Sequence, residues 1–343
     1  MSFAHSHAAS YARVLSRLSG VEVVAADPDH DRRPGETGGP ALAADLGVDY
    51  VGDYPTLLAR NPDAVIVCSE NADHRRLVEL AADAGVHVLC EKPIATTLTD
   101  ADAMTAVCAA AGVQLMIAHP VRFAPAFATL RETVLSGSLG EVVSLVGTNN
   151  GRIPRGERAW FVDPIAAGGG ALTDHLVHVL DLLDAVWPQA RVRSVYAIAN
   201  RLLHPESEVE TAGLAALHLD LASTTSGGGP ADRRLPVVID ASWSRPASYP
   251  TWGGLTLRVI GTGGISVCDP FAARVGGQLE SMQNAAWIPY GPDLDALLLR
   301  EFLAVAAGER PAAPDGVSGT RGLAVVLAAY ESLRVGQPAA PRA

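Results

Sequence analysis

The sequence lacks the features that mark membrane, nucleic-acid-binding and disulfide-rich proteins. No window of the 343 residues has the length and apolarity of a membrane span, although 48% of the residues are hydrophobic. No cluster of Lys and Arg is present, and a net charge of −11 opposes binding to nucleic acid. The four cysteines form no CxxC pair, so we expect reduced thiols in a cytoplasmic protein. From these absences we expect that the protein binds neither nucleic acid nor a membrane.

The first third of the chain alternates short apolar strands with helical segments. Strands are expected at 21–26, 49–52, 64–69, 86–91 and 113–119, and helices at 41–46, 55–60, 74–84 and 99–111. This alternation predicts a doubly wound parallel sheet, in which ligands bind at the carboxyl ends of the strands. Polar residues follow these strands: Asp27, Ser69 to Asn71, Glu91, Lys92 and His119.

After a helix at 125–136 the pattern changes to longer alternating strands. They are expected at 141–151, 191–202, 213–223, 235–244 and 255–267, and helices follow at 293–307 and 318–335. Such strands predict an open, mainly antiparallel sheet. We therefore expect an α/β protein with a Rossmann-like domain at 1–120, a second α/β domain at 121–336 and a tail at 337–343.

The segment GGGALTDHLVHVLDLLD, residues 168–184, carries one chemical signal. Three glycines lead into a helical pattern in which Asp174, His178 and Asp181 share one stripe. The other positions are nearly all apolar, so this helix should be buried. Buried acids and histidines are usually partnered, bound to a ligand or used in chemistry. A plain alternative is an Asp174–His178 pair, one helical turn apart.

A second signal is Glu91-Lys92-Pro93 at a strand end. An ammonium group there can polarise a hydroxyl or carbonyl oxygen, and the proline fixes the backbone next to it. The alternative is a surface lysine paired with Glu91.

Together, EKPIATTLTDADAM and GGGALTDHLVHVLD resemble the glucose-fructose oxidoreductase, inositol dehydrogenase and rhizopine-catabolism (Gfo/Idh/MocA) family of NAD(P)-dependent oxidoreductases. The resemblance extends to Asn71, His74, Arg122-Phe123, GEVVSLVG and GLAVVLAAYESLRVG, in family order. It implies a dinucleotide-binding Rossmann domain and an α/β substrate domain whose sheet often makes oligomer contacts, so a homo-oligomer is expected. It also implies that Lys92 is the catalytic lysine, Asp174 the substrate-binding aspartate and His178 the catalytic histidine.

The chemistry of these side chains agrees with such roles. Oxidation of a secondary alcohol requires a base near neutral pKa, which suits the imidazole of His178. Asp174 would orient the hydroxyl or raise the basicity of the imidazole, Lys92 would stabilise the reacting oxygen, and the cofactor would take the hydride. A metal site at Asp174, His175 and His178 is disfavoured because His175 lies about 100° from Asp174 around the helix. His5 and His7 are expected at the surface or at the cofactor edge.

The family's first strand and glycine-rich turn should precede Ala4, which takes the turn's third small-residue position. The chain starts at Met1, so we hypothesise a truncated gene model. Asp27 matches the acid that binds the adenosine ribose, which favours NAD. The neighbouring Arg32 and Arg33 leave NADP possible.

The resemblance implies two further sets of site residues. Cofactor binding is expected from Ala4, Asp27, Ser69, Asn71, His74, Glu91, Lys92 and Pro93. The substrate is expected to be a sugar, cyclic polyol or related compound, bound by His119, Arg122, Asn150, Arg152, Trp160 and Asp174. The alternative for Arg122 is a structural ion pair, and the alternative for Trp160 is simple packing. The expected activity is a dehydrogenase; a redox-assisted glycoside hydrolase or epimerase and a non-catalytic nucleotide-binding sensor are the alternatives.

Overall fold

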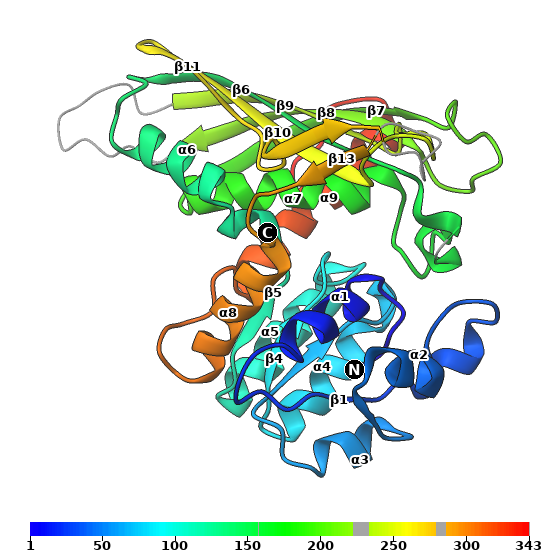
Figure 1. Cartoon of the computed structure of the whole chain (residues 1–343). Coiled ribbons are helices and arrows are strands. Elements are labelled where there is room, and N and C mark those ends of the chain that lie inside the picture. Colours follow the sequence, from blue (N-terminus) through cyan, green and yellow to red (C-terminus); the bar gives the residue numbers. More distant parts are fainter. Residues whose placement is uncertain (157, 222–232, 279–285, 343) are drawn as a thin grey trace. The chain divides into compact units, whose positions relative to one another are not determined.

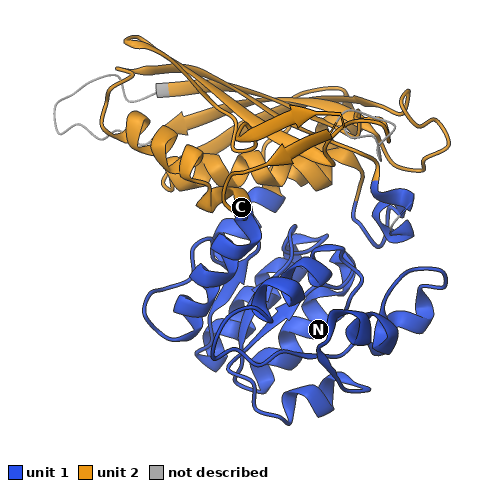
Figure 2. Ribbon diagram, in the orientation of Figure 1, with its two compact units in different colours: residues 1–120, 154–168, 293–323 blue, residues 121–153, 169–292, 324–343 orange. Residues whose placement is uncertain are grey.

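The computed structural model describes residues 1–156, 158–221, 233–278 and 286–342. The chain divides into two compact units, the first comprising 1–120, 154–168 and 293–323, and the second 121–153, 169–292 and 324–343 (Figure 2). The first unit therefore contains the range predicted for the first domain, together with two later segments. The predicted tail is attached to the second unit, because Ala339 pairs with Val195.

The first unit is built around parallel strands. β3 (Ala64–Val67), β4 (His87–Cys90) and β5 (Leu115–Ile117) form one parallel sheet, and β1 (Val24–Ala25) pairs in parallel with β2 (Asp49–Tyr50). The start of the chain lies between these groups, because Ser2 N donates to Ala26 O and Met1 N donates to Ile66 O. The predicted strand ends thus fall close to the observed ones.

Helices flank these strands, as the alternating pattern predicts (Figure 1). They are α1 (His7–Leu15), α2 (Gly39–Leu46), α3 (Tyr54–Leu58), α4 (His74–Asp83), α5 (Leu98–Ala111) and α8 (Leu294–Ala306). α5 begins where the Thr97 side chain accepts the Asp100 N–H and ends at Gly112 in the left-handed conformation. α8 joins the first unit because it packs on α1, where Ser10 Oγ donates to Asp295.

The second unit contains a six-stranded sheet in the order β11-β10-β6-β9-β8-β7. The strands are β6 (Val142–Gly151), β7 (Arg191–Asn200), β8 (Ala212–Leu221), β9 (Arg233–Ser242), β10 (Gly253–Gly261) and β11 (Gly264–Cys268). The sheet is mixed, since β6 and β9 run parallel while the other neighbours are antiparallel. Residues 222 and 223, the predicted end of one strand, lie outside the described residues.

Two details differ from the expected strands. The segment 255–267 was predicted as one strand, but it turns back between Gly261 and Gly264 and forms the β10–β11 hairpin. A separate antiparallel pair of β12 (Arg274–Gly277) and β13 (Ala286–Pro289) was not predicted, since both strands are only four residues long and β12 ends in two glycines.

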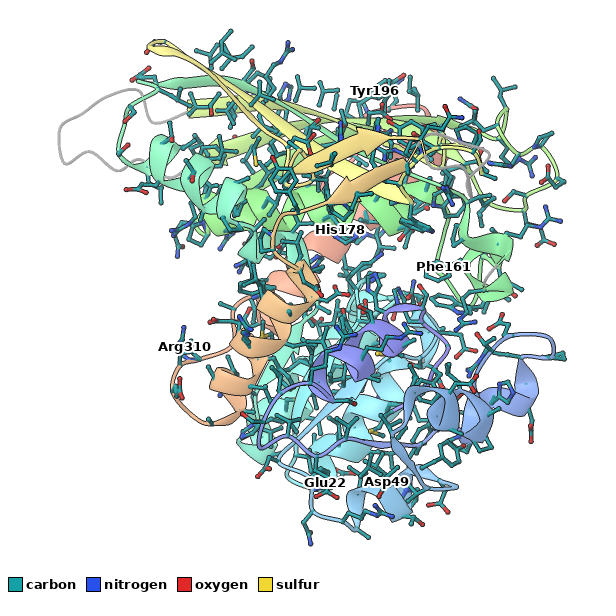
Figure 3. All side chains as sticks on the ribbon, viewed as in Figure 1. Glu22, Asp49, Phe161, His178, Tyr196 and Arg310 are labelled. Carbon is teal, nitrogen blue, oxygen red and sulfur yellow. The ribbon has the colours of Figure 1, made fainter. Side chains whose placement is uncertain are left out.

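Helices cover one face of the large sheet. α7 (Ala171–Val186) packs on β6, β8 and β9, next to α6 (Pro125–Leu135) and the second half of α9 (Gly316–Val335). Leu145, Gly147 and Asn149 of β6 are buried on this side, as the period of two requires. Figure 3 shows Tyr196 on the opposite face of the sheet from His178.

Short 3-10 helices complete the described chain, at Pro28–Arg32, Asn71–Asp73, Pro120–Phe123, Pro154–Gly156 and Ala159–Val162. Among the helices in the described ranges, none combines the length and apolarity needed to cross a bilayer.

Candidate active site

The first turn of α7 carries a buried carboxylate with two neighbours. Asp174 Oδ2 accepts a hydrogen bond from Trp243 Nε1 at 3.0 Å and lies 3.1 Å from His175 Nε2. Trp243 follows β9 and is almost fully buried. The two side chains meet although they are separated by about 100° around the helix, a contact that the sequence did not predict.

His178 lies one helical turn after Asp174 and is half-buried (Figure 3). Asp181, the third residue of the predicted stripe, is occupied differently. Its carboxylate oxygens lie 2.7–3.1 Å from Arg122 nitrogens, and Asp184 Oδ2 lies 3.3 Å from Arg122 Nη2. Burial alone would lower the pKa of Arg122, but the carboxylates of Asp181 and Asp184 raise it by more, so the net shift is upward. The structure thus gives Arg122 the ion pair that was the alternative to substrate binding.

Two adjacent asparagines of β6 face opposite sides of the sheet. Asn149 is buried on the α7 side, where its Nδ2 donates to His175 O at 3.3 Å. Asn150, the predicted substrate residue, bonds Asp240 Oδ1 at 3.1 Å and Ser242 Oγ at 2.6 Å on the other face. The strand period of two places Asn149 in line with Leu145 and Gly147, and the role of Asn150 toward a substrate stays a prediction.

Arg152 follows β6, is half-buried and donates from its guanidinium to the Tyr249 carbonyl. It therefore fixes the segment before β10, and its predicted role toward a substrate stays a prediction.

In the first unit, Glu91 collects several hydrogen-bond donors at the end of β4. Tyr11 Oη donates to Glu91 Oε1 at 2.7 Å, His7 Nδ1 lies 3.0 Å from the same oxygen, and the Lys92 N–H donates to Oε2 at 3.2 Å. Burial alone would raise the pKa of Glu91, but His5 and His7 hold it well below its ordinary value. The carboxylate is therefore ionised although it is buried.

His5, His7 and Glu91 bring three metal-ligand atoms within 4.8 Å of one another. His5 is buried, which excludes the surface alternative and leaves the cofactor edge as a prediction; His7 is partly exposed. His5 Nδ1 accepts the His7 backbone N–H at 3.2 Å, so neutral His5 carries its proton on Nε2, the nitrogen that faces Glu91 at 3.8 Å. Glu91 also accepts from Tyr11 and from the Lys92 N–H, so in this structure the group forms part of a hydrogen-bonded cluster.

Lys92 is the only lysine in the chain and is 4% exposed at the carboxyl end of β4. The segment after it is held by His74, whose Nδ1 lies 3.0 Å from Pro93 O and 3.2 Å from Ile94 O. Burial lowers the pKa of His74, which therefore stays neutral and donates to a carbonyl. The Lys92–Pro93 peptide is cis.

Asp27 ends β1 and is buried. Its Oδ1 accepts from Arg33 Nη2 at 2.7 Å and its Oδ2 from the Gly39 N–H at 2.9 Å. Arg33 is in turn paired with Glu36 and Glu70, so three carboxylates surround one guanidinium. Burial raises the pKa of Asp27, but Arg33 and the Gly39 N–H lower it, and the net direction is downward.

Three of the remaining predicted residues of the first unit, Trp160, Asn71 and Ser69, donate hydrogen bonds to main-chain carbonyl groups. Trp160 stacks on Phe161 and donates from Nε1 to Ala4 O at 3.0 Å, which is the packing alternative. Asn71 Nδ2 donates to Ala167 O at 2.8 Å, and Ser69 Oγ donates to Glu70 O at 3.2 Å. His119 is buried just after β5.

Comparison with known proteins decides what this arrangement belongs to. Residues 3–119 match the model described as "Oxidoreductase family, NAD-binding Rossmann fold", and residues 127–267 match the GFO/IDH/MocA C-terminal domain. The chain belongs to the Gfo/Idh/MocA oxidoreductase family. Its first unit therefore carries the NAD-binding Rossmann fold of that family.

Two curated relatives and one solved structure illustrate the membership. A D-xylose 1-dehydrogenase (NADP(+)) from Haloferax volcanii is 40% identical over 38% of this chain and 41% of its own length. A D-glucoside 3-dehydrogenase from Escherichia coli is 38% identical over 46% of this chain and 45% of its own. The chain thus spans less than half the length of these relatives. The crystal structure of GenD2 from gentamicin A biosynthesis in complex with NAD has a TM-score of 0.82 at 23% identity, covering 98% of this chain and 93% of that one, which shows the shared fold.

The contacts of Trp243, Asn149 and Tyr11 were not predicted from the sequence. Asn149 had a signal, the alternation of β6. Trp243 lies 69 residues from Asp174, and Tyr11 lies 80 residues from Glu91, so neither contact could be read from local spacing.

Proposed function

We propose that this chain is an NAD(P)-dependent dehydrogenase that oxidises a secondary alcohol of a sugar or cyclic polyol. The observation that carries the proposal is the Asp174–Trp243–His175 arrangement at the start of α7, followed one turn later by the half-buried His178. A carboxylate held in place by a buried indole N–H is oriented before a substrate arrives. The dehydrogenase names of the two relatives agree with this reaction class.

In this proposal His178 takes the hydroxyl proton, because an imidazole has a proton affinity suited to general base catalysis near neutral pH. Asp174 accepts a hydrogen bond from a neighbouring hydroxyl and so orients the substrate. The Lys92 ammonium group donates to the reacting oxygen and favours the anionic form that develops as the proton leaves. A bound nicotinamide would supply the hydride acceptor.

The residues at the end of β1 fit NAD better than NADP. Asp27, Glu36 and Glu70 outnumber the single cation of Arg33, which they hold in place. A carboxylate accepts the two ribose hydroxyls, whereas a 2′-phosphate would meet like charge. Arg32, the other candidate for binding a phosphate, is paired with Asp29 and Asp73.

We also propose a homo-oligomer that uses the face of the large sheet opposite α7. Tyr196, Ile198 and Leu214 are 44%, 52% and 43% exposed there, and a neighbouring group of apolar side chains on one face is typical of an interface. Sedimentation of the purified chain, compared with a Tyr196→Glu/Leu214→Glu variant, tests it. A monomeric wild type contradicts it.

The activity is tested by NADH formation from a panel of sugars and cyclic polyols. We expect substrate-dependent reduction in the wild type, its loss in His178→Ala and Lys92→Met, and its retention in His218→Ala, an exposed histidine on the other face of the sheet. Tightly held NAD with conversion of a glycoside but no net NADH would instead identify a redox-assisted hydrolase or epimerase. Unchanged cellular function in His178→Ala would favour a sensor.

Because Lys92 is the only lysine, a single chemical reaction reports on it. Acylation of its amine, located by peptide mass spectrometry, should slow when NAD is present. An unchanged acylation rate at saturating NAD would contradict the placement of Lys92 at the cofactor.

A further inference from the structure

The N-terminus of α7 is capped by residues distant in the sequence. Its N-cap position is Gly170, which offers no side chain to the first N–H groups of the helix. Glu210, which lies shortly before β8, takes over this task. Its main-chain oxygen accepts the Ala171 N–H at 3.0 Å, and its Oε1 accepts the Leu172 N–H at 2.9 Å.

The Gly170 N–H is bound by the same group. Both carboxylate oxygens of Glu210 lie 3.2 Å from Gly170 N, and Tyr330 Oη of α9 lies 3.0 Å from it. Tyr330 Oη donates to Glu210 Oε1 at 2.8 Å and lies 2.9 Å from Thr173 Oγ1. The N–H groups of three consecutive residues, 170–172, therefore donate to Glu210, and Tyr330 of α9 holds the glutamate in place.

The glycines before α7 are required by this contact. A Cβ on Gly170 would lie 2.1 Å from Glu210 O, and a Cβ on Gly169 would lie 2.0 Å from Tyr330 Oη. Gly169 also has φ of +144°, which other residues rarely adopt. The glycine run thus lets Glu210 and Tyr330 approach the helix end closely, rather than serving only as a flexible hinge.

We propose that Glu210 is the positioning residue of the α7 site, fixing the axial position and rotation of the helix that presents Asp174 and His178. The proposal rests on the dehydrogenase function for its kinetic consequence only. Asp174 lies in the same turn that Glu210 holds, so a shift of this turn changes the Asp174–Trp243 hydrogen bond directly. Tyr330 supports the glutamate and is not itself placed in the site.

The surroundings of the Glu210 carboxyl group are consistent with its role as the cap of α7. Burial raises the pKa of its carboxyl group, whereas the Leu172 N–H and Tyr330 O–H lower it, and the net direction is upward. Its oxygens accept hydrogen bonds at the positive end of the α7 dipole.

The experiment compares Glu210→Ala with Glu210→Gln, whose amide oxygen still accepts from Leu172 and Tyr330. Glu208→Gln removes an exposed charge from the same loop, and Thr97→Ala removes a helix cap from α5, so both are matched controls. The first readout is the indole ¹H–¹⁵N signal of Trp243, assigned with Trp243→Phe, because it reports on the Asp174 contact without any activity. The second is the split between kcat and the cofactor KM.

We expect Glu210→Ala to move the Trp243 signal and lower kcat about tenfold or more, with the cofactor KM within about twofold. Glu210→Gln should restore both toward wild type, and the two controls should change neither. A folded Glu210→Ala protein with the Trp243 signal and kcat of the controls would overturn the proposal. If that variant does not fold, Tyr330→Phe decides by the same two readouts, because it removes the donor to Glu210.

The two proposals fail in different ways. A wild type that reduces no NAD with any polyol removes the dehydrogenase function, and the Trp243 signal still decides the role of Glu210. If the wild type is an active dehydrogenase and Glu210→Ala leaves both the Trp243 signal and kcat unchanged, the proposed function stands and the positioning role of Glu210 is wrong.

Discussion

Trp243 donates its indole N–H to Asp174 Oδ2, the same oxygen that lies 3.1 Å from His175 Nε2. One carboxylate oxygen therefore joins the end of β9 to the first turn of α7. Asp174 and Trp243 are both buried, so the loss of either side chain leaves the other with a polar group that neither water nor a protein partner can hydrogen-bond.

Replacing Trp243 with Phe should lower the free energy of unfolding by about 1.5–3 kcal/mol, the range for a buried hydrogen bond to a charged group. Denaturant unfolding measures the change. Trp252→Phe, at a half-exposed indole in the same unit, is the control and should change stability little. Equal effects of the two substitutions would contradict a special role for the Asp174 contact.

Breaking the Arg122–Asp181 pair should be costly to the fold. Arg122→Met leaves the buried Asp181 carboxylate uncompensated, which typically costs about 3–5 kcal/mol. Adding Asp181→Leu should restore most of that loss, because the unpaired charge is removed. The measurement is a double-mutant cycle by urea unfolding. A substrate KM that rises in Arg122→Met without loss of stability would instead return Arg122 to the substrate-binding set.

Asn149 and Asn150 offer a matched pair. Asn149→Ala should lower kcat/KM about fivefold, since it removes a hydrogen bond worth about 1 kcal/mol that holds the His175 backbone. Asn150→Ala removes contacts on the opposite face and should leave kcat/KM unchanged. Steady-state kinetics of both variants are the test, and the reverse order of effects would show that the assignment of faces does not govern the site.

The Glu91–His7 pair should make stability depend on pH in a defined window. Burial lowers the pKa of His7 but the Glu91 charge raises it, and the net direction is upward. His7 therefore contributes stability that is complete below its unfolded pKa of about 6.5 and is lost as pH rises through the folded value. Glu91, with its lowered pKa, contributes above about pH 4.3 and loses that contribution as pH falls through its folded value.

The test of this pair is urea unfolding from pH 5 to 9 in the wild type and in His7→Gln. The wild type should lose more stability than the variant above about pH 6.5. His74, whose lowered pKa acts in the opposite direction, is common to both proteins and cancels in the difference. Parallel curves would contradict the coupling of His7 to Glu91.

Cofactor choice should respond to Asp27. Asp27→Asn removes the charge-assisted acceptor proposed for the ribose hydroxyls, so the KM for NAD should rise about tenfold or more. The KM for NADP should fall relative to that for NAD. Asp49→Asn removes an exposed carboxylate of the same unit, which is paired with Arg60, and serves as the control. A wild type that prefers NADP would contradict the assignment of Asp27.

The sequence predicted the parallel strands well because their apolar runs and glycine-ended helices are local signals. The helix at Ala171–Val186 was also readable from its periodicity. The strand period alone predicts which side chains of β6 lie on the same face, so the burial of Asn149 beside Leu145 and Gly147 was readable from the sequence. By contrast, the partners of Asp174 and Asp181 depend on how β9 and the segment before α6 pack on α7, and pairwise packing over 59–69 residues leaves no local pattern.

The bracing of α7 by Tyr330 has a consequence for protein synthesis. Tyr330 follows Gly170 by 160 residues, so a growing chain presents the α7 segment long before its brace exists. At about 5–20 residues per second, roughly 8–32 s pass between the two on the ribosome. Glu210 is synthesised 40 residues after Gly170, so it can cap α7 during the later part of this interval, and the Tyr330 contacts with Glu210, Gly170 and Thr173 form only after α9 has emerged.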